Sequence, residues 1–305
     1  MTPAGTNVRV DGKELTLSNL DKVLYPEAGF TKGQVIGYYQ AVAPVLLPHL
    51  VGRPLTLKRY PNGVDEPFFY EKRCPSHRPQ WVKVAPVWSR RNKGEVPYCL
   101  ADDLATLVWV ANLASLELHT SLSRADDIAR PTMVVFDLDP GPPATVVECC
   151  RVGLRLRELF DRMGLEAFAK TSGSKGLQLY IPLNTAVGYD GGTKDFALSV
   201  AQLFEQRFPG EVVSSMNKEL RRGKVFIDWS QNDEHKTTVC VYSLRARPRP
   251  TVSTPVTWDE VAGTAEAEDP DLLVFEADAV VERVSRLGDL FAPLNELEQK
   301  LPNLV

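Results

Sequence analysis

Hydrophobic and polar positions along the chain follow both strand-like and helix-like periods. Apolar and polar residues alternate over 8–17 on either side of Asp11-Gly12, a dipeptide that favours a β-hairpin turn. Helical spacing follows Thr31, a residue that suits a helix N-cap, and it continues to residue 49. Residues 53–60 then predict a strand, which ends at a Pro-Asn-Gly turn.

The remaining elements follow without a regular βαβα order. The pattern predicts a buried helix over 101–118, a strand at 132–138, helices at 144–164 and 193–208, strands at 177–183, 223–230 and 237–244, and an acidic helical region at 270–288. This order favours an α+β fold with largely antiparallel sheets over a doubly wound parallel sheet. We expect one domain over residues 1–305, with a weakly marked subdomain boundary near 130.

The composition is that of an ordinary globular protein, with 44% hydrophobic and 24% charged residues among 305. No apolar run reaches the ~20 residues of a membrane helix, and the N-terminus lacks an apolar signal core. We therefore expect a cytoplasmic protein without a membrane partner. The five cysteines form no CxxC pair, and only four histidines accompany them. The expectation is buried, reduced thiols rather than a zinc site.

The net charge of −4 hides a strong segregation of charge along the chain. Residues 1–100 carry +6 and residues 151–250 carry +5, whereas residues 101–150 carry −6 and residues 251–305 carry −9. An overall acidic balance argues against nucleic acid as a partner, but two basic regions around an acidic insert fit an anion-binding face with a local carboxylate cluster.

The most informative pattern is VVFDLDPG at 134–141. Side chains two apart in a strand share a face, so Asp137 and Asp139 point the same way and Phe136 points into the core. Two adjacent carboxylates repel each other unless a cation lies between them, and oxygen ligands suit magnesium or manganese. A second strand, KVFIDWSQN, adds Asp228, which completes a three-carboxylate set of the kind that two-metal phosphoryl transfer needs.

Two further segments offer groups that bind phosphate. The loop Ser172-Gly173-Ser174-Lys175-Gly176 precedes a strand, and its glycines let backbone N–H groups approach phosphate oxygens beside the charge of Lys175. The loop lacks the spacing of a P-loop. Basic residues cluster at 218–224 and 236–249, where Arg245 follows the segment VCVYSL and has the geometry to hold a triphosphate bidentately.

Taken in order, DLDP, TSGSKGLQLYIPL, KVFIDWSQN and YSLRAR resemble the polymerase domain of bacterial ATP-dependent DNA ligase D, in the archaeo-eukaryotic primase superfamily. The resemblance extends upstream to LDKVLYP, KRYPNGVDEPFFYEK and LELH and covers roughly residues 13–295. It implies a primase-polymerase fold with two mixed, largely antiparallel sheets flanked by helices. The chain is also similar to stand-alone primase-polymerases that act with a separate ligase C.

The resemblance carries roles onto matching residues. It implies metal ligation by Asp137, Asp139 and Asp228, with His119 beside the incoming nucleotide. It places Ser172, Lys175 and Arg245 on the triphosphate, and Lys58, Gln231 and Arg221 around the nucleotide. It also implies that Lys22 and Lys32 hold a downstream 5′-phosphate and that Phe68 and Phe69 stack on the template. Without the family, His119 reads as a packed histidine at a helix end, and Phe68-Phe69 as core residues.

Three features depart from the family pattern. Gln178 stands where the family usually has a histidine, and an amide cannot carry a proton charge. The stretch between His119 and Asp137 is shorter than in fused enzymes, which suggests a trimmed surface loop. No ligase or nuclease sequence accompanies the chain, so we expect a stand-alone relative or a piece of a fusion.

The sequence therefore predicts a DNA-dependent nucleotidyltransferase that adds nucleotides, preferentially ribonucleotides, to primer 3′-ends at 5′-phosphorylated gaps or broken ends. The resemblance implies two manganese or magnesium ions, nucleoside triphosphate substrates, and a DNA ligase and a Ku-type protein as partners near the nucleoid. Two other functions stay open on the residues: a non-catalytic DNA-end or gap-binding module that recruits a ligase, and a DxD glycosyltransferase.

Overall fold

The computed structural model describes residues 5–89 and 92–302, which form two compact units. The first unit comprises Met1–Ser121, Val239–Val252 and Glu276–Asp289, and the second comprises Leu122–Thr238, Ser253–Phe275 and Leu290–Val305. Each unit thus gathers segments that are distant in the sequence. The single catalytic domain and its boundary near residue 130 stay predictions.

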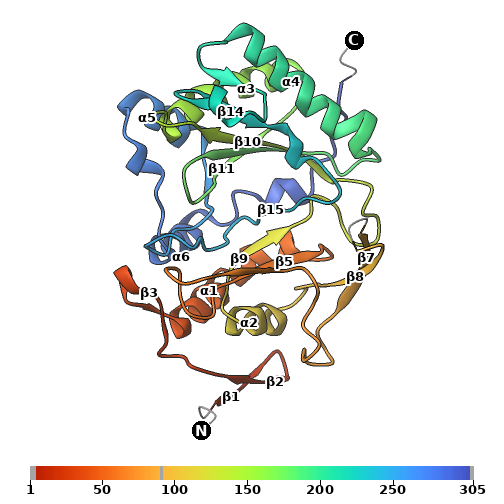
Figure 1. Cartoon of the computed structure of the whole chain (residues 1–305), viewed down its shortest axis with the longest axis vertical. Helices are drawn as coiled ribbons and strands as arrows, with labels where there is room; N and C mark the ends of the chain where they lie inside the picture. Colours follow the sequence, from red (N-terminus) through yellow and green to blue (C-terminus); the bar gives the residue numbers. More distant parts are fainter. Residues whose placement is uncertain (1–4, 90–91, 303–305) are drawn as a thin grey trace. The chain divides into compact units, whose positions relative to one another are not determined.

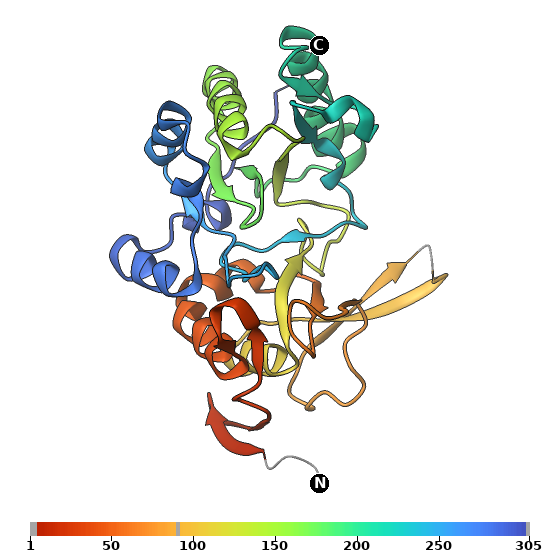
Figure 2. The same cartoon turned by 60° about the vertical axis from the view of Figure 1, so that its left-hand side comes forward.

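The first unit contains a sheet in the order β15-β9-β5-β8-β7, with β6 paired to β5 (Figure 1). Its elements are β1 (Thr6–Val10), β2 (Lys13–Leu17), β3 (Val23–Tyr25), β4 (Phe30–Thr31), α1 (Lys32–Leu50), β5 (Leu55–Arg59), β6 (Phe69–Glu71), β7 (Val84–Ser89), β8 (Gly94–Cys99), α2 (Leu104–Asn112), β9 (Ser115–Thr120), β15 (Thr238–Val239) and α6 (Ala277–Leu287). The helices α1 and α2 pack against each other, and the β7–β8 hairpin extends from the unit in Figure 2.

The first hairpin and the first helix confirm the local sequence signals. Asp11 and Gly12 both have positive φ, 47° and 76°, as a two-residue turn between right-twisted strands requires. Thr31 caps α1 by accepting from the backbone of Gln34, whose side chain accepts from the Thr31 N–H in return. Both elements are specified by residues only a few positions apart.

The predicted helix over 101–118 is wrong after Asn112. Helix α2 ends at Asn112, the chain reverses at Ala114 with φ of 58°, and Ser115–Thr120 form β9 against β5. His119 therefore lies in a strand and not at a helix end. An apolar run has the same appearance in a buried helix and in a buried strand, so only pairing with β5 decides between them.

The predicted strand over 237–244 is also mostly wrong, because only Thr238–Val239 pair as β15. Tyr242 has a φ of 61°, which interrupts an extended strand. Leu244 then makes an isolated bridge with Val252. The segment is consequently a bent connection that presents Arg245 from a loop.

The second unit is built on a sheet in the order β13-β14-β10-β12-β11-β16. Its elements are β10 (Met133–Pro140), α3 (Val146–Arg162), β11 (Phe168–Thr171), β12 (Leu177–Pro182), α4 (Lys194–Arg207), β13 (Val212–Val213), β14 (Val225–Asp228), β16 (Pro255–Val256) and α5 (Trp258–Ala267). Only the β13–β14 pair is parallel among these neighbours. This confirms the α+β prediction with largely antiparallel sheets.

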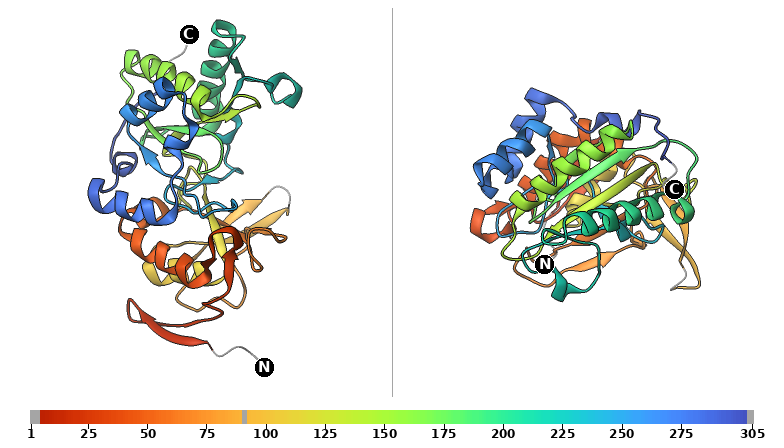
Figure 3. Two further views of the ribbon diagram at one scale, coloured as in Figure 1. Left: turned by 90° about the vertical axis from the view of Figure 1, so that its left-hand side faces the viewer. Right: turned by 90° about the horizontal axis from the view of Figure 1, so that it is seen from above.

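Helices α3 and α4 cover one face of this sheet, as the view from above in Figure 3 shows. Val134, Phe136 and Leu138 of β10 point into the core beneath them, together with Val225 and Ile227 of β14. Because strand side chains alternate, Asp137 and Asp139 lie on the opposite face. The apolar face anchors the sheet and leaves its other face for polar chemistry.

The cysteines correct another expectation. Cys74 and Cys99 form a disulfide, whereas Cys149, Cys150 and Cys240 are buried thiols as expected. The Cys74 N–H donates to Pro97 O at 2.7 Å, which brings the loop after β6 beside the end of β8. Because the two cysteines are 25 positions apart, no local sequence pattern predicts that they pair. Among the described residues, no helix has the length and apolar character needed to span a membrane.

Candidate functional site

In the second unit, four polar residues from four adjacent strands align in one row across the sheet. The backbone register pairs Asp228 with Asp137, Asp137 with Gln178, and Gln178 with Lys170. We call this set, Asp228, Asp137, Gln178 and Lys170, the polar row. It lies on the face opposite to the core, with two carboxylates at one end and one buried ammonium at the other.

The Asp137 carboxyl of the polar row has a strongly shifted pKa. Asp137 is half-buried and Asp139, on the same face of β10, is exposed. Burial and the neighbouring charges of Asp139 and Asp228 raise the pKa of Asp137 from 3.8 to about 7, although the hydrogen bond with Gln178 opposes this rise. Negative charge is therefore in excess here, which is the electrostatic condition that a bound cation relieves.

Asp228 is held by its own strand end. Its Oδ1 accepts from the Ser230 N–H at 3.0 Å and from Ser230 Oγ at 2.5 Å, and its Oδ2 accepts from Gln231 Nε2 at 2.8 Å. The structure thus places Gln231, a predicted nucleotide contact, on a predicted metal ligand. No group of three His, Cys, Asp or Glu side chains among residues 5–89 and 92–302 is arranged to hold a metal ion.

The other end of the polar row is a buried lysine. Lys170 is 1% exposed, and its Nζ donates to Gln178 Oε1 at 2.5 Å and to Ser253 Oγ at 2.6 Å. Gln178 in turn makes the hydrogen bond that lowers the pKa of Asp137. An amide suits this place because its carbonyl accepts from the ammonium while its NH₂ donates to the carboxylate. This explains how Gln178 fits between the Lys170 ammonium and the Asp137 carboxylate.

The glycine-containing loop lies between β11 and β12, as its position before a strand predicted. Ser172 Oγ accepts from the backbone N–H groups of Ser174, Lys175 and Gly176 at 3.0–3.2 Å. The Ser172 hydroxyl therefore organises the loop, while Lys175 is exposed to solvent. A Cβ on Gly176 would lie 2.1 Å from the Leu138 carbonyl oxygen, so the loop can approach β10 only with glycine there.

Arg221 lies over the aromatic ring of Phe226, with its guanidinium carbon 3.6 Å from the ring centroid. Phe226 pairs with Asp139 in the register between β14 and β10, and it shares the face of Asp228. The Arg221 Nη2 donates to Met216 O at 2.9 Å. The second unit thus brings Arg221 near the carboxylate face by stacking rather than by an ion pair.

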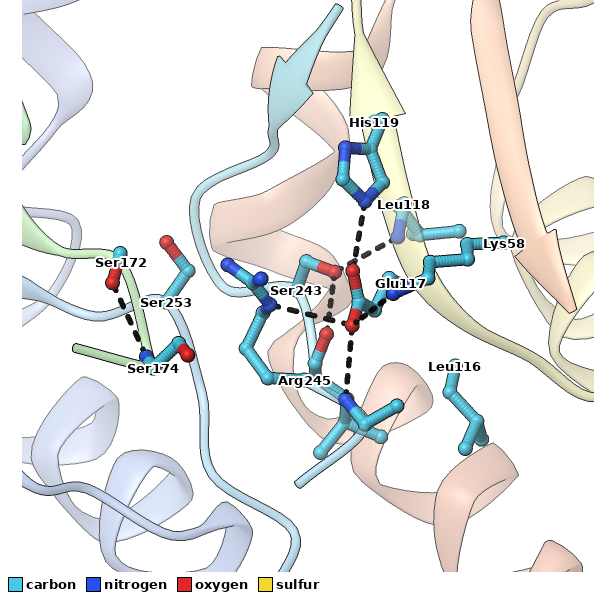
Figure 4. A network of polar contacts seen from close by, with 12 residues as sticks. Lys58, Leu116, Glu117, Leu118, His119, Ser172, Ser174, Ser243, Arg245 and Ser253 are labelled. Atoms are coloured by element: carbon cyan, nitrogen blue, oxygen red, sulfur yellow. Dashed lines mark hydrogen bonds and ion pairs between the residues drawn. The ribbon is translucent and has the colours of Figure 1, made fainter. Parts of the chain in front are cut away.

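In the first unit, a single buried carboxylate gathers three of the predicted nucleotide contacts (Figure 4). Glu117 Oε1 lies 3.3 Å from Lys58 Nζ and 3.5 Å from Arg245 Nε, and it accepts from the Ala246 N–H at 3.1 Å. Glu117 Oε2 lies 2.9 Å from His119 Nε2. We call these four side chains, Lys58, Glu117, His119 and Arg245, the Glu117 cluster.

The charges of the Glu117 cluster shift the pKa values of its members in the expected directions. Burial alone would raise the pKa of Glu117, but the hydrogen bond from His119 and the charges of Arg245 and Lys58 hold it well below its ordinary value. The pKa of His119 is lowered by burial and by the two cations, against the effect of Glu117. At neutral pH the cluster consequently holds an ionised Glu117 and a neutral His119.

Three aromatic rings lie around Lys58: Phe68 and Tyr70 are exposed, and Tyr60 is buried. Its Nζ lies 4.4 Å from the ring centroid of Phe68, 5.3 Å from that of Tyr60 and 5.7 Å from that of Tyr70. Phe68 and Phe69 are 48% and 44% exposed, so the reading of this pair as core residues does not hold. Exposed rings beside a cation are the groups that stack on unpaired bases.

Lys32 is the first residue of α1, and its backbone N–H donates to the carbonyl of Lys22, which directly precedes β3, at 2.8 Å. Lys22 is exposed and donates to Asn62 Oδ1 at 2.8 Å, whereas Lys32 is 5% exposed and donates to Ser18 O at 2.7 Å. Burial, with Lys22 and Arg59 nearby, lowers the pKa of Lys32 from 10.5 to about 8. Two repelling cations of this kind form a place where an anion is favourable.

The predicted residues therefore fall into two groups, one in each unit. The sequence reasoning missed Glu117 and Lys170, which hold the predicted residues in place. Glu117 lies within the LELH motif, and its position two residues before His119 in a strand was the available signal. Lys170 directly precedes the TSGSKG loop, but no local pattern shows that its ammonium is buried.

The family model for "LigD, primase-polymerase domain" matches residues 31–291 of this chain. The chain is 44% identical over 285 residues to the multifunctional non-homologous end joining protein LigD of Mycolicibacterium smegmatis, covering 93% of the chain and 36% of that protein. It is 30% identical to the bifunctional LigD of Bacillus subtilis, covering 90% of the chain and 43% of that protein. The chain thus spans less than half the length of these relatives.

The fold matches a solved structure described as the polymerase domain from Mycobacterium tuberculosis Ligase D in complex with DNA. The TM-score is 0.85 and the sequence identity is 42%, and the match covers 93% of this chain and 99% of that chain. The similarity therefore holds along the chain and includes both units.

Proposed function

The chain belongs to the family of LigD primase-polymerase domains, and on that premise we propose that it is a DNA-dependent nucleotidyltransferase of DNA end joining. It would extend a primer 3′-end at a short gap or a broken end. The observation that carries this proposal is the pair of carboxylates in the polar row, Asp137 and Asp228, with Asp139 on the same sheet face. Burial and the two neighbouring charges raise the pKa of Asp137 to about 7, and a bound cation would relieve this excess of negative charge.

Asp137, Asp139 and Asp228 are the residues that would hold the divalent ions. Their donors are all carboxylate oxygens, which suit magnesium or manganese, and manganese follows from the family resemblance. Two such ions would lower the pKa of the primer hydroxyl and neutralise charge on the triphosphate. Asp228 Oδ1 accepts two hydrogen bonds and Oδ2 accepts one, so Oδ2 keeps an acceptor site for a cation.

The lysine and arginine side chains would bind two different phosphate groups. Lys58, Lys175, Arg221 and Arg245 would bind the nucleoside triphosphate, with ribonucleotides preferred. Lys22 and Lys32 would hold the 5′-phosphate at the far side of a gap, because their mutual repulsion favours an anion between them. Phe68 and Phe69 would stack on template bases. A DNA ligase and a Ku-type end-binding protein are the partners that this role requires.

Primer extension tests the activity. With manganese and each nucleotide type, we expect ribonucleotide addition to a primer across a one-nucleotide gap. A folded protein that shifts gapped DNA in a gel but adds no nucleotide would instead be a binding module. Turnover of nucleotide sugars without DNA binding would indicate a glycosyltransferase.

The gap-phosphate pocket has its own test. We expect Lys22→Ala combined with Lys32→Ala to remove the preference for a 5′-phosphorylated gap, about a tenfold effect, while addition to an open primer end persists. The salt dependence of binding should fall by about two ionic contacts, as measured on gapped DNA at several salt concentrations. An unchanged preference for the phosphate would contradict the assignment of both lysines.

A further inference from the structure

Glu117 contacts three predicted site residues and one backbone N–H. It is 2% exposed, and its two oxygens face Lys58, His119, Arg245 and the Ala246 N–H. A buried carboxylate is costly unless donors satisfy it, and here every donor except one backbone N–H comes from a predicted nucleotide contact. The arrangement orders those three side chains before any ligand arrives.

The contact with His119 fixes which ring nitrogen carries the proton. An ionised carboxylate only accepts hydrogen bonds, so His119 Nε2, 2.9 Å from Glu117 Oε2, must be the donor. Because the pKa of His119 is lowered, the ring is neutral at pH 7 and its Nδ1 keeps a lone pair. Figure 4 shows the Nε2 edge of the ring facing Glu117 and the other ring nitrogen turned away from it.

We propose that Glu117 is a positioning residue that fixes His119 in its Nε2-protonated tautomer, so that Nδ1 accepts a hydrogen bond from a sugar hydroxyl. This inference rests on the proposed nucleotidyl transfer for the identity of its ligand. At neutral pH, phosphate oxygens are acceptors and are poor partners for an unprotonated Nδ1. The sugar hydroxyls are the donors that a nucleotide and a primer end offer.

The same carboxylate leaves the phosphates to the cations. Lys58 and Arg245 carry only donors, and both face Glu117 Oε1, at 3.3 Å and 3.5 Å. One negative charge between two positive charges reduces their repulsion but leaves a net positive cluster, which attracts a triphosphate. Glu117 would therefore separate two tasks: hydroxyl recognition by His119 and phosphate recognition by Lys58 and Arg245.

NMR spectroscopy determines the tautomer of His119 directly. The chain has four histidines, so the ring nitrogens of a ¹⁵N-labelled protein give a resolvable long-range ¹H–¹⁵N spectrum. We expect His119 to show the Nε2–H pattern in the unmodified protein, and Glu117→Gln to convert it to a mixture of tautomers. The matched control is Asp289→Asn, because His49 Nε2 lies 2.8 Å from Asp289 Oδ2 and forms a second histidine–carboxylate pair in the same unit. It should change the signals of His49 and not those of His119.

Kinetics supply the second readout. We expect Glu117→Gln to lower kcat/KM for ribonucleotide addition by about a hundredfold through misplacement of the three side chains, while Asp289→Asn stays within threefold. Comparing ribo- and 2′-deoxynucleotides identifies the hydroxyl. A loss confined to ribonucleotides indicates the 2′-hydroxyl of the incoming nucleotide, and an equal loss with both indicates a hydroxyl that both reactions share, such as the 3′-hydroxyl of the primer.

Two results would overturn the inference. One is an unmodified protein in which His119 carries its proton on Nδ1, a result that does not depend on whether any variant folds. The other is a folded Glu117→Gln protein with unchanged His119 signals or with kcat/KM within threefold of the original. An unmodified protein that adds no nucleotide would contradict the proposed function instead, and the spectrum would still decide the tautomer.

Discussion

The polar row and the Glu117 cluster use carboxylates in opposite ways. In the Glu117 cluster, one carboxylate lies among the cations Lys58 and Arg245, and its pKa is held well below the ordinary value. In the polar row, carboxylates lie beside one another, and the pKa of Asp137 is raised to about 7. The first region satisfies its charge within the chain, whereas the second leaves negative charge for a ligand to neutralise.

The difference follows from where a lysine lies relative to Glu117 and to Asp137. Lys58 faces Glu117 directly, whereas Lys170 donates to Gln178, whose side chain forms a hydrogen bond with Asp137. A preformed cluster of cations suits a nucleotide pocket, and a site with excess negative charge suits a metal ion.

The largest effect is expected from a substitution of Asp137, near the centre of the polar row. Asp137→Ala should reduce nucleotide addition by about a thousandfold or more, because it would remove the several kcal/mol of transition-state stabilisation that the proposed cations would supply. Single-nucleotide extension on gapped DNA with manganese measures this. Circular dichroism should show an intact fold, since the core face of β10 is untouched. Substantial nucleotide addition by the folded variant would show that Asp137 of the polar row is not needed for catalysis.

A smaller effect is expected at the other end of the polar row. Lys170→Met removes the hydrogen bonds from the ammonium to Gln178 Oε1 and Ser253 Oγ, although Tyr180 OH still donates to Gln178 Oε1, so the free energy of unfolding should fall by about 2 kcal/mol, as measured with urea. Nucleotide addition should fall about tenfold because Gln178 no longer orients Asp137.

The control is Lys194→Met, which removes a partly exposed lysine paired with Asp233 in the same unit. It should change stability by less than about 1 kcal/mol and leave addition unchanged. Equal effects of the two lysine substitutions would show that Lys170 contributes only an ordinary ion pair.

The smallest expected effect is a difference in pH dependence between the two regions. The folded pKa of Asp137 lies above its ordinary 3.8, so its contribution to stability is complete at low pH and is lost as pH rises towards about 7. The folded pKa of Glu117 lies below its ordinary 4.5, so its contribution is present above pH 4.5 and is lost as pH falls.

Thermal melts without divalent ions measure this difference. Asp137→Asn should raise Tm by a few degrees near pH 8 and leave it unchanged near pH 4. Manganese should stabilise the unmodified protein near pH 8 more than the variant. Glu117→Gln should instead lower Tm at neutral pH and converge with the unmodified protein in acid. Parallel curves for the two variants would contradict the contrast between the regions.

Much of the local structure followed from the sequence. The hairpin at Asp11-Gly12, the Thr31 cap and the common face of Asp137 and Asp139 each depend on residues a few positions apart. The errors lie where distant pairing decides. Residues 115–120 become a strand because β5 lies beside them, and Cys74 meets Cys99 because its loop lies against β8.

The sequence by itself determined the family, the motifs and the carboxylates that share a strand face, because strand alternation and motif order are properties of the chain. Only the tertiary structure decided that Asp228, Asp137, Gln178 and Lys170 form one row, since the register of four strands sets it. It also decided that Glu117 is buried among cations, because their segments converge only on folding. Burial and neighbouring charge then give identical carboxyl groups opposite pKa shifts.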